Sequence, residues 1–238
     1  MAEQPQQPPS APEPHPDEAQ RRAPADQPGI REDDVRRSIF VAAARLLAYP
    51  DRALSTLLPE IETYLRELPT SGPTTTLVTV AGRLREVGVT ELEARYVATF
   101  DFNEPTALYL TAHELGDSRR RGQALIELRA LLRAAGFEEA TAELPDYLPL
   151  LLEFLGHAPA GAPLDALDAL DALERRLAAA CERICTHMDA DNLYRDIFVA
   201  LREVFPEPAE PNPDQRFTQR EQADTGEMPY PLRYDELQ

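Results

Sequence analysis

Apolar residues recur at helical spacing through the centre of this chain, from about residue 35 to about residue 205 of its 238 residues. Side chains three, four and seven positions apart lie on one face of an α-helix, where they can pack against a core. No segment shows the alternating, glycine-punctuated pattern of a strand. The spacing therefore predicts an all-α fold, a single helical domain of about eight helices.

Proline and small polar residues divide this central region into segments. Pro59 is expected to break a helix. Thr90, with a glutamate three residues later, is expected to cap one, and Pro105 and Pro145 are expected to begin two others. The residues after Thr74 are β-branched, which favours a strand, but their apolar spacing is helical. The expected helices span about 33–49, 53–68, 74–87, 90–100, 106–115, 119–135, 147–155, 163–187 and 193–205.

The two ends of the chain differ from its centre in composition. Residues 1–34 and 206–238 together hold 14 of the 23 prolines, and each end has eight acidic residues against three Arg. Such segments bury too little apolar surface to offset the entropy of ordering. We therefore predict a disordered Pro- and acid-rich tail over 1–34, the helical domain over 35–205, and a second disordered tail over 206–238.

The charged residues exclude several classes of function. All 24 basic residues are Arg, so the chain lacks the lysine of a phosphate-binding loop, of a pyridoxal phosphate Schiff base and of a protein kinase. The formal net charge is −18, which argues against nucleic acid or an anionic membrane as the main partner. A cationic partner is more compatible with this charge.

Metal and thiol chemistry have little support in the sequence. No His is preceded by Glu at three positions, as in di-iron bundles, and Asp117 stands where a zinc-protease helix beginning at His113 needs its second His. Cys181 and Cys185 share a helical face, so they could be two thiolate ligands or two packed thiols. Two ligands do not close a site, so we predict structural thiols and no metal or other cofactor.

The sequence also bears on the cellular compartment. Two cysteines provide no disulfide framework, which is typical of a reducing compartment. No stretch approaches 18 consecutive apolar residues, and the N-terminus has no basic and then apolar signal. We expect a cytoplasmic protein that does not insert directly into a membrane.

Three blocks of residues stand out within the helical region. They are Glu93-x-x-Tyr96-Val97-x-x-Phe100-Asp101, then Leu108-x-Leu110-x-x-His113-x-x-Gly116-Asp117-Ser118-Arg119-x-Arg121-Gly122-Gln123-Ala124, and then Glu143-Leu144-Pro145-Asp146-Tyr147-Leu148-Pro149-Leu150-x-x-Glu153-Phe154-Leu155. In this order they resemble the nitrate reductase molybdenum cofactor assembly chaperones of the NarJ type, relatives of the TorD/DmsD redox-enzyme maturation chaperones. The resemblance covers about residues 39–205.

The resemblance implies a chaperone and not an enzyme. Its client would be the apo catalytic α subunit of a respiratory nitrate reductase, bound through the N-terminal segment of that subunit. The chaperone would support molybdenum cofactor insertion and complex assembly before membrane attachment. No nucleic acid partner and no cofactor of its own are expected.

Residues of the three blocks become candidates for client binding. The candidates, including a neighbouring leucine of the third block, are Tyr96, Phe100, Asp101, Leu108, His113, Arg119, Arg121, Pro145, Asp146, Tyr147, Leu151 and Glu153. Helix-in-groove recognition would use four of them as apolar walls, namely Tyr96, Phe100, Tyr147 and Leu151, with acidic residues at the rim. Apolar residues at this spacing are also typical of a core.

Two further points concern individual positions. After Asp101 the family often has a basic stretch, whereas this chain has Phe102-Asn103-Glu104-Pro105, so an anion-contacting role is not inherited here. His113 lies beside Glu114 near a predicted helix end, so it could titrate near neutral pH and couple client release to protonation.

Two other classes of function remain open on the sequence alone. The chain could be a helical adaptor or regulatory module that binds other proteins without a role in cofactor loading. It could also be a metalloenzyme, although its His and Cys residues lack the spacing of a closed metal site.

Overall fold

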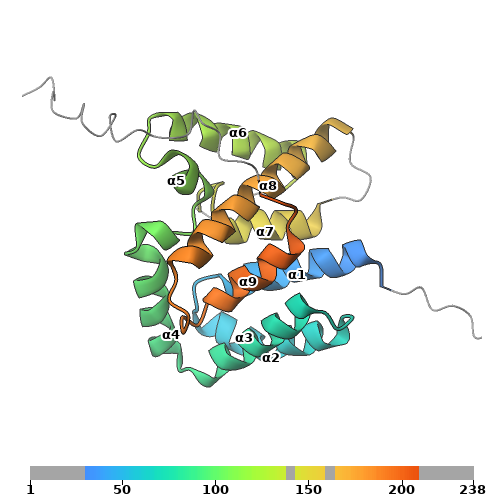
Figure 1. The fold of residues 1–238 in the computed structure, drawn as a ribbon, viewed down its shortest axis with the longest axis vertical. Coiled ribbons are helices and arrows are strands. Elements are labelled where there is room, and N and C mark those ends of the chain that lie inside the picture. The colour runs from blue at the N-terminus through green and yellow to red at the C-terminus, as the bar shows by residue number, and fades with distance from the viewer. Residues whose placement is uncertain (1–29, 138–142, 159–163, 209–238) are drawn as a thin grey trace, which may run out of the picture.

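The computed structural model describes residues 30–137, 143–158 and 164–208. In these residues every named element is a helix and there is no named strand, which confirms the predicted all-α fold (Figure 1). The elements are α1 (Glu32–Leu46), α2 (Arg52–Glu67), α3 (Gly72–Glu86), α4 (Val89–Tyr96), the π-helix η1 (Val97–Asp101), the 3₁₀ helix η2 (Glu104–Thr106), α5 (Leu110–Leu115), α6 (Arg120–Ala134), α7 (Leu148–His157), α8 (Leu164–His187) and α9 (Arg195–Val204).

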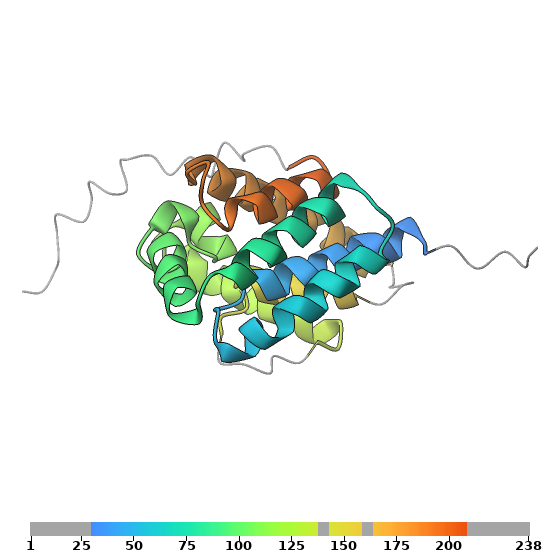
Figure 2. The same ribbon diagram turned by 90° about the horizontal axis from the view of Figure 1, so that it is seen from below.

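The helices pack in layers around α1. Helix α1 lies against α7, α2, α3 and α9, and α8 lies against α9. Seen from below in Figure 2, α2 and α3 run side by side across one end of the molecule. Helices α5 and α6 occupy the other end, where α5 contacts both α6 and α8 (Figure 1). The largest fully buried side chains, among them Phe40, Phe154, Tyr194 and Phe198, come from α1, α7, the start of α9 and α9 itself.

Helices α1 and α7 approach each other unusually closely at Gly156. A Cβ atom built on Gly156 would lie 2.4 Å from Cγ2 of Val41 and 3.1 Å from the backbone oxygen of Arg37. Both contacts are shorter than ordinary van der Waals separation, so a larger residue would push the two helices apart. The glycine therefore allows the two central helices to pack against each other.

The expected break at Pro59 is wrong. Helix α2 continues through Pro59, which lies on the exposed side of the helix. The ring removes one backbone donor, but the carbonyl of Ser55 that loses its partner lies near solvent and can bind water. The helix is also fixed at its start, where the side chain of Asp51 accepts a hydrogen bond from the backbone N–H of Leu54 (2.9 Å).

Three expected helix starts differ from the structure. Helix α4 has Gly88 as its N-cap, and no side chain caps it, so the predicted capping box at Thr90 is wrong. Pro105 lies in η2, and Tyr109 is extended before α5 begins at Leu110. Helix α7 begins at Leu148 with Pro149 in its first turn, so Pro145 precedes the helix.

The described helices begin at Glu32, in α1, and end at Val204, in α9. Helix α1 already begins at Glu32, with Glu32, Asp33 and Asp34 in its first turn, where acidic side chains favour the helix dipole. The disorder predicted for the tails concerns mainly residues 1–29 and 209–238, which lie outside the described residues.

Candidate functional site

Residues 108–110 of the second sequence block pair with residues 146–148 of the third block, and we call this backbone pairing the clasp. Tyr109 and Tyr147 form an isolated antiparallel bridge. The N–H of Leu110 donates to the carbonyl of Asp146 (2.9 Å), and the N–H of Leu148 donates to the carbonyl of Leu108 (2.9 Å). These bonds hold Tyr109 extended and explain why the helix expected from Thr106 begins only at Leu110.

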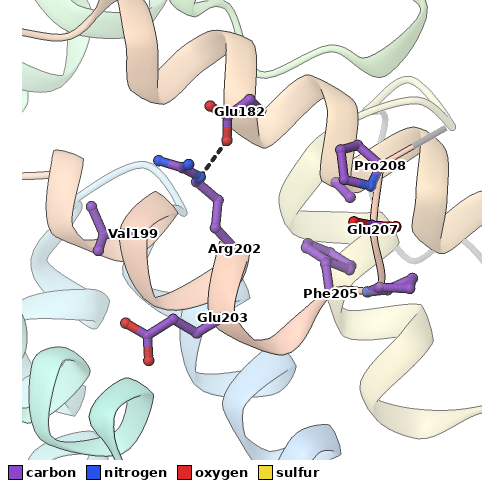
Figure 3. Close-up of a pocket in the computed structure, with 9 residues that line it drawn as sticks. Glu182, Val199, Arg202, Glu203, Phe205, Glu207 and Pro208 are labelled. Carbon is purple, nitrogen blue, oxygen red and sulfur yellow. Dashed lines mark ion pairs between the residues drawn. The ribbon is translucent and has the colours of Figure 1, made fainter. Parts of the chain in front are cut away.

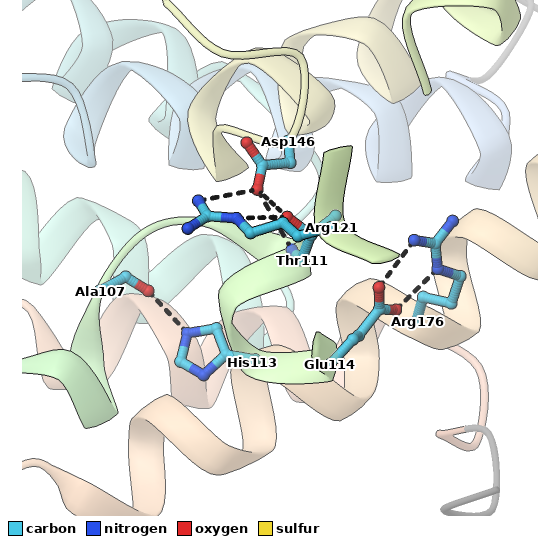
Figure 4. Close-up of polar contacts among 7 residues, drawn as sticks. All are labelled: Ala107, Thr111, His113, Glu114, Arg121, Asp146 and Arg176. Atoms are coloured by element: carbon cyan, nitrogen blue, oxygen red, sulfur yellow. Dashed lines mark hydrogen bonds and ion pairs between the residues drawn. The ribbon is translucent and has the colours of Figure 1, made fainter. Parts of the chain in front are cut away.

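The side chain of Asp146 reinforces the clasp from inside. It is fully buried and accepts hydrogen bonds from the hydroxyl and the backbone N–H of Thr111, the latter at 3.3 Å (Figure 4). Arg121 donates from Nε to the Thr111 hydroxyl (3.0 Å) and places Nη2 3.6 Å from Oδ2 of Asp146. A buried carboxylate requires such partners. The network therefore joins the start of α5, the first turn of α6 and the segment before α7.

An aromatic cluster packs below the clasp. The hydroxyl of Tyr96 donates to the carbonyl of Leu47 (3.1 Å) and shares a 2.9 Å hydrogen bond with the hydroxyl of Tyr147. The ring of Tyr96 lies edge-on to Phe100 at 4.8 Å and to Tyr194 at 5.8 Å. Burial raises the pKa of Tyr96 and raises that of Tyr147 to about 12, so both phenols stay protonated near neutral pH.

His113 is held as a neutral hydrogen-bond donor. Its Nε2 lies 2.6 Å from the carbonyl oxygen of Ala107, which can only accept, so this nitrogen carries the proton. Burial lowers the pKa of His113 below its usual value. Both oxygens of the neighbouring Glu114 bind Arg176 at 2.7 Å (Figure 4). Burial therefore opposes the expected titration of His113 near neutral pH and outweighs the carboxylate of Glu114, while the coupling of client release to protonation stays a prediction.

Burial divides the twelve predicted binding residues into two groups. Those buried in the structure are Tyr96, Phe100, Leu108, Pro145, Asp146 and Leu151. The prediction that Tyr96, Phe100 and Leu151 line a groove is wrong for this arrangement of the chain, because their side chains fill the core. These buried residues position the surface above them.

The other six predicted residues reach the surface. Those partly or fully exposed are Asp101, His113, Arg119, Arg121, Tyr147 and Glu153. Glu153 is bound by Arg45 (2.6 Å). Arg119 is exposed and has no side-chain partner among the described residues. Arg121 belongs to the Asp146 network, so only part of this group is available to a partner.

An acidic and aromatic surface lies over the clasp. Tyr109 packs on Tyr147 with ring centroids 5.7 Å apart, and both rings are partly exposed. Burial raises the pKa of Tyr109, the carboxylates of Glu143, Asp146 and Asp101 raise it further, and Arg121 opposes them, which places these four charges near the ring. We call the surface formed by Asp101, Tyr109, Glu143, Leu144 and Tyr147 the clasp face.

Sequence reasoning missed Tyr109 as a site residue. Its neighbours Leu108 and Leu110 are both fully buried, and the backbone between them is extended, so the side chain of Tyr109 turns outward. The alternation of apolar and aromatic residues from Leu108 to Leu110 was the available signal, but helical spacing was assumed there. Leu144, which is 40% exposed, was likewise not predicted as a site residue.

A separate cleft of about 440 Å³ lies between α8, α9 and the segment after α9 (Figure 3). It has an apolar lining that includes Val199 and Phe205, and three acidic residues, Glu182, Glu203 and Glu207. Arg202 in this cleft is bound to Glu182. None of the twelve predicted residues lines the cleft, so its chemistry is independent of the three blocks.

The cysteines take part in packing. Cys181 and Cys185 are buried in the core on α8, and burial raises the pKa of Cys181. Both side chains are enclosed in the core, which agrees with the prediction of structural thiols. Within the described ranges, no three His, Cys, Asp or Glu side chains gather in a way that could hold a metal ion.

None of the described helices combines the length and the apolar character needed to cross a bilayer.

The described residues form an all-helical fold that a solved structure shares. The structure is similar to a crystal structure of a putative redox enzyme maturation protein from Archaeoglobus fulgidus, with a TM-score of 0.50, 18% sequence identity, and coverage of 77% of this chain and 98% of that one. At this identity the likeness shows the fold alone.

Sequence comparison identifies the family of this chain. A family model described as nitrate reductase delta subunit matches residues 51–200, so the chain belongs to that family. It is 30% identical over 166 residues to a Bacillus subtilis protein named probable nitrate reductase molybdenum cofactor assembly chaperone NarJ, covering 70% of this chain and 87% of that protein. It is 32% identical over 146 residues to the Escherichia coli K12 protein named nitrate reductase molybdenum cofactor assembly chaperone NarJ, covering 54% of this chain and 55% of that protein.

Proposed function

We propose that this chain is a nitrate reductase assembly chaperone that supports molybdenum cofactor insertion into the catalytic subunit. The match to the delta subunit family carries the proposal, because residues 51–200 contain all three sequence blocks and the whole clasp face. The names of the Bacillus subtilis and Escherichia coli relatives support the same role. The chain acts by binding, without catalysing a reaction.

The proposed client is the apo α subunit of a respiratory nitrate reductase, held through its N-terminal segment in the cytoplasm before membrane attachment. A segment with apolar and basic side chains fits the clasp face, since Tyr109, Leu144 and Tyr147 offer apolar surface and Asp101 and Glu143 are acidic. Burying three client side chains at about 1.5 to 3 kcal/mol each contributes roughly 5 to 9 kcal/mol. Association opposes this by about 4 kcal/mol or more, so moderate and reversible affinity is expected.

Capture from cells that respire nitrate tests the proposal. Tagged full-length chain should recover the α subunit, and deletion of the N-terminal residues of that subunit should abolish the capture. The reductase from cells without this chain should contain little molybdenum. Recovery of unrelated proteins with a normally loaded reductase would favour a helical adaptor instead.

A pair of tyrosine variants tests the location. Tyr109→Ser removes a ring from the clasp face and should weaken capture. Tyr64→Ser removes a ring that is 46% exposed on α2, at the other end of the molecule from α5, and should leave capture unchanged (Figure 1). Equal capture by both variants and the wild type would move the binding site away from the clasp face.

A further inference from the structure

Phe102 is the most exposed large apolar side chain in the described part of the protein. Its exposed fraction is 86%, and the next value among such residues is 63%, for Ile126 on α6. Single exposed apolar residues are common and do not by themselves mark a binding site. The backbone that carries Phe102 and the charges around it provide the additional evidence.

A π-helix places Phe102 at the surface. Helix α4 leads directly into η1, and the N–H of Phe102 closes this wider turn by donating to the carbonyl of Val97 (3.3 Å). Phe100, two residues earlier, points inward and lies 5.1 Å from the ring of Tyr194. Single π-turns inside or at the end of α-helices occur frequently at functional sites. The turn thus separates one buried and one exposed phenylalanine.

The loop after Phe102 is held by hydrogen bonds. The buried hydroxyl of Thr106 lies between the carbonyls of Thr99 and Asn103, and the N–H of Thr106 donates to the carbonyl of Asn103 (2.9 Å). Asn192, from the segment before α9, donates from Nδ2 to the Thr99 hydroxyl (3.1 Å). Element η2 also packs against α8. Phe102 is therefore presented on a pre-organised backbone, and a partner would not have to order the loop on binding.

The charged residues nearest to Phe102 in the sequence are both acidic. Asp101 and Glu104 are exposed, and neither forms an ion pair within the described ranges. The sequence has no basic residue from Tyr96 to Ser118 apart from His113, whose ring is partly buried. On the other side of η1, Asp189 and Asp191 line a cleft of about 230 Å³ whose only arginine, Arg95, is bound to Glu91 (2.6 Å).

We infer that Phe102, flanked by Asp101 and Glu104, is the anchor through which this chain binds a partner segment that is both apolar and basic. The inference rests on the proposed function, and the occupant is the N-terminal segment of the apo α subunit. The Phe102 ring packs among apolar side chains of that segment, and the two carboxylates meet its cations. Asp101 belongs also to the clasp face, so the anchor extends that face toward η1.

A second copy of this chain is a poorer occupant. The chain has a formal net charge of −18, and residues 35–205 alone hold 26 acidic residues against 18 Arg. Like charge on two copies disfavours contact at an acidic loop. A cationic segment of another protein has the opposite charge and is favoured there.

Peptide binding by full-length variants tests the anchor. The probe is a fluorescent synthetic peptide with the sequence of the α subunit N-terminus, and the readout is its anisotropy. Phe102→Ala should weaken binding by about tenfold or more, as loss of a central aromatic anchor does. Asp101→Asn with Glu104→Gln should weaken binding less and reduce its salt dependence. Ile126→Ala, the matched exposed control on α6, should bind as the wild type does.

The possible outcomes separate this inference from the proposed function. Wild-type affinity in Phe102→Ala, with normal binding by the wild type, would overturn the anchor and leave the proposed function standing. If the wild type binds neither the peptide nor the apo subunit, the proposed function fails and the assigned occupant fails with it. If Phe102→Ala changes only the sedimentation of the chain from dimer to monomer, the occupant is a second copy and the inference is wrong. Thermal unfolding checks that each variant is folded.

Discussion

At the scale of single residues, family resemblance and burial assign different roles to the same positions. Asp146 is one of the positions carried over for binding, yet its side chain is enclosed with Thr111 and Arg121. Because Asp146 joins the segment before α7 to α5 and α6, it can support the clasp face although its own side chain is not exposed there. Asp146 therefore acts by holding Tyr147 and Tyr109 in the clasp.

Asp146→Asn should lower the free energy of unfolding by about 1 to 3 kcal/mol. The amide keeps the shape of the carboxylate but loses its charge, which weakens the contacts with Thr111 and Arg121 in a buried site. Urea denaturation followed by circular dichroism measures the change. Asp101→Asn, on the exposed loop, should alter stability by less than about 0.5 kcal/mol. Equal stability of the two variants would show that the network contributes nothing.

His113 should make the fold sensitive to acid. Burial lowers its pKa in the native state, so the unfolded chain binds the proton at a higher pH than the folded chain does. Stability from this group is complete above its unfolded pKa of about 6.5 and is lost as pH falls toward the native pKa. His113→Asn should remove this part of the decrease. Urea midpoints at about pH 7.5 and about pH 5.5, on either side of that reference value, measure it. An identical decrease in variant and wild type would contradict the assignment.

At the scale of elements, tertiary contacts decide what local signals leave open. Helix α2 tolerates Pro59 because the proline faces solvent. The segment after Pro105 leaves helical geometry because Leu108 and Leu110 pair with residues 146–148. Both outcomes depend on neighbours that lie far away in the sequence or on the face that a residue presents, so spacing along one segment could not reveal them.

Gly156→Ala and Gly122→Ala should change stability in opposite directions. In Gly156→Ala the new methyl group would lie 2.4 Å from Val41 and 3.1 Å from the Arg37 carbonyl, which should destabilise the α1–α7 contact by about 1 to 3 kcal/mol. A Cβ on Gly122, in exposed α6, meets nothing within 4 Å, so alanine should stabilise that helix by about 0.4 to 1 kcal/mol. Chemical denaturation of both variants gives the comparison. Stabilisation by Gly156→Ala would show that the two helices can separate at little cost.

At the scale of the whole molecule, the sequence predicted the architecture better than the site. Apolar spacing located α1 and α8 because a helix that buries one face must repeat its apolar residues. The same spacing could not distinguish residues that line a binding groove from residues that fill the core. Phe100 was therefore predicted to line the groove, although it is buried. Phe102 was noted only as a departure from the family, because its exposure depends on the turn of η1. Whether a given side chain is exposed depends on how the helices pack, and the spacing within one segment does not contain that information.

The net charge should control how fast a client segment arrives. Residues 35–205 are acidic even without the ends of the chain, so the body itself attracts a basic peptide. Raising salt from about 0.05 to about 0.5 M shortens the screening length severalfold and should slow association about tenfold, with a much smaller change in dissociation. Stopped-flow mixing of the full chain with the α subunit N-terminal peptide measures both rates. A peptide with its basic residues changed to Gln is the control and should associate slowly at every salt concentration. An association rate that is independent of salt would show that apolar contact alone selects the client.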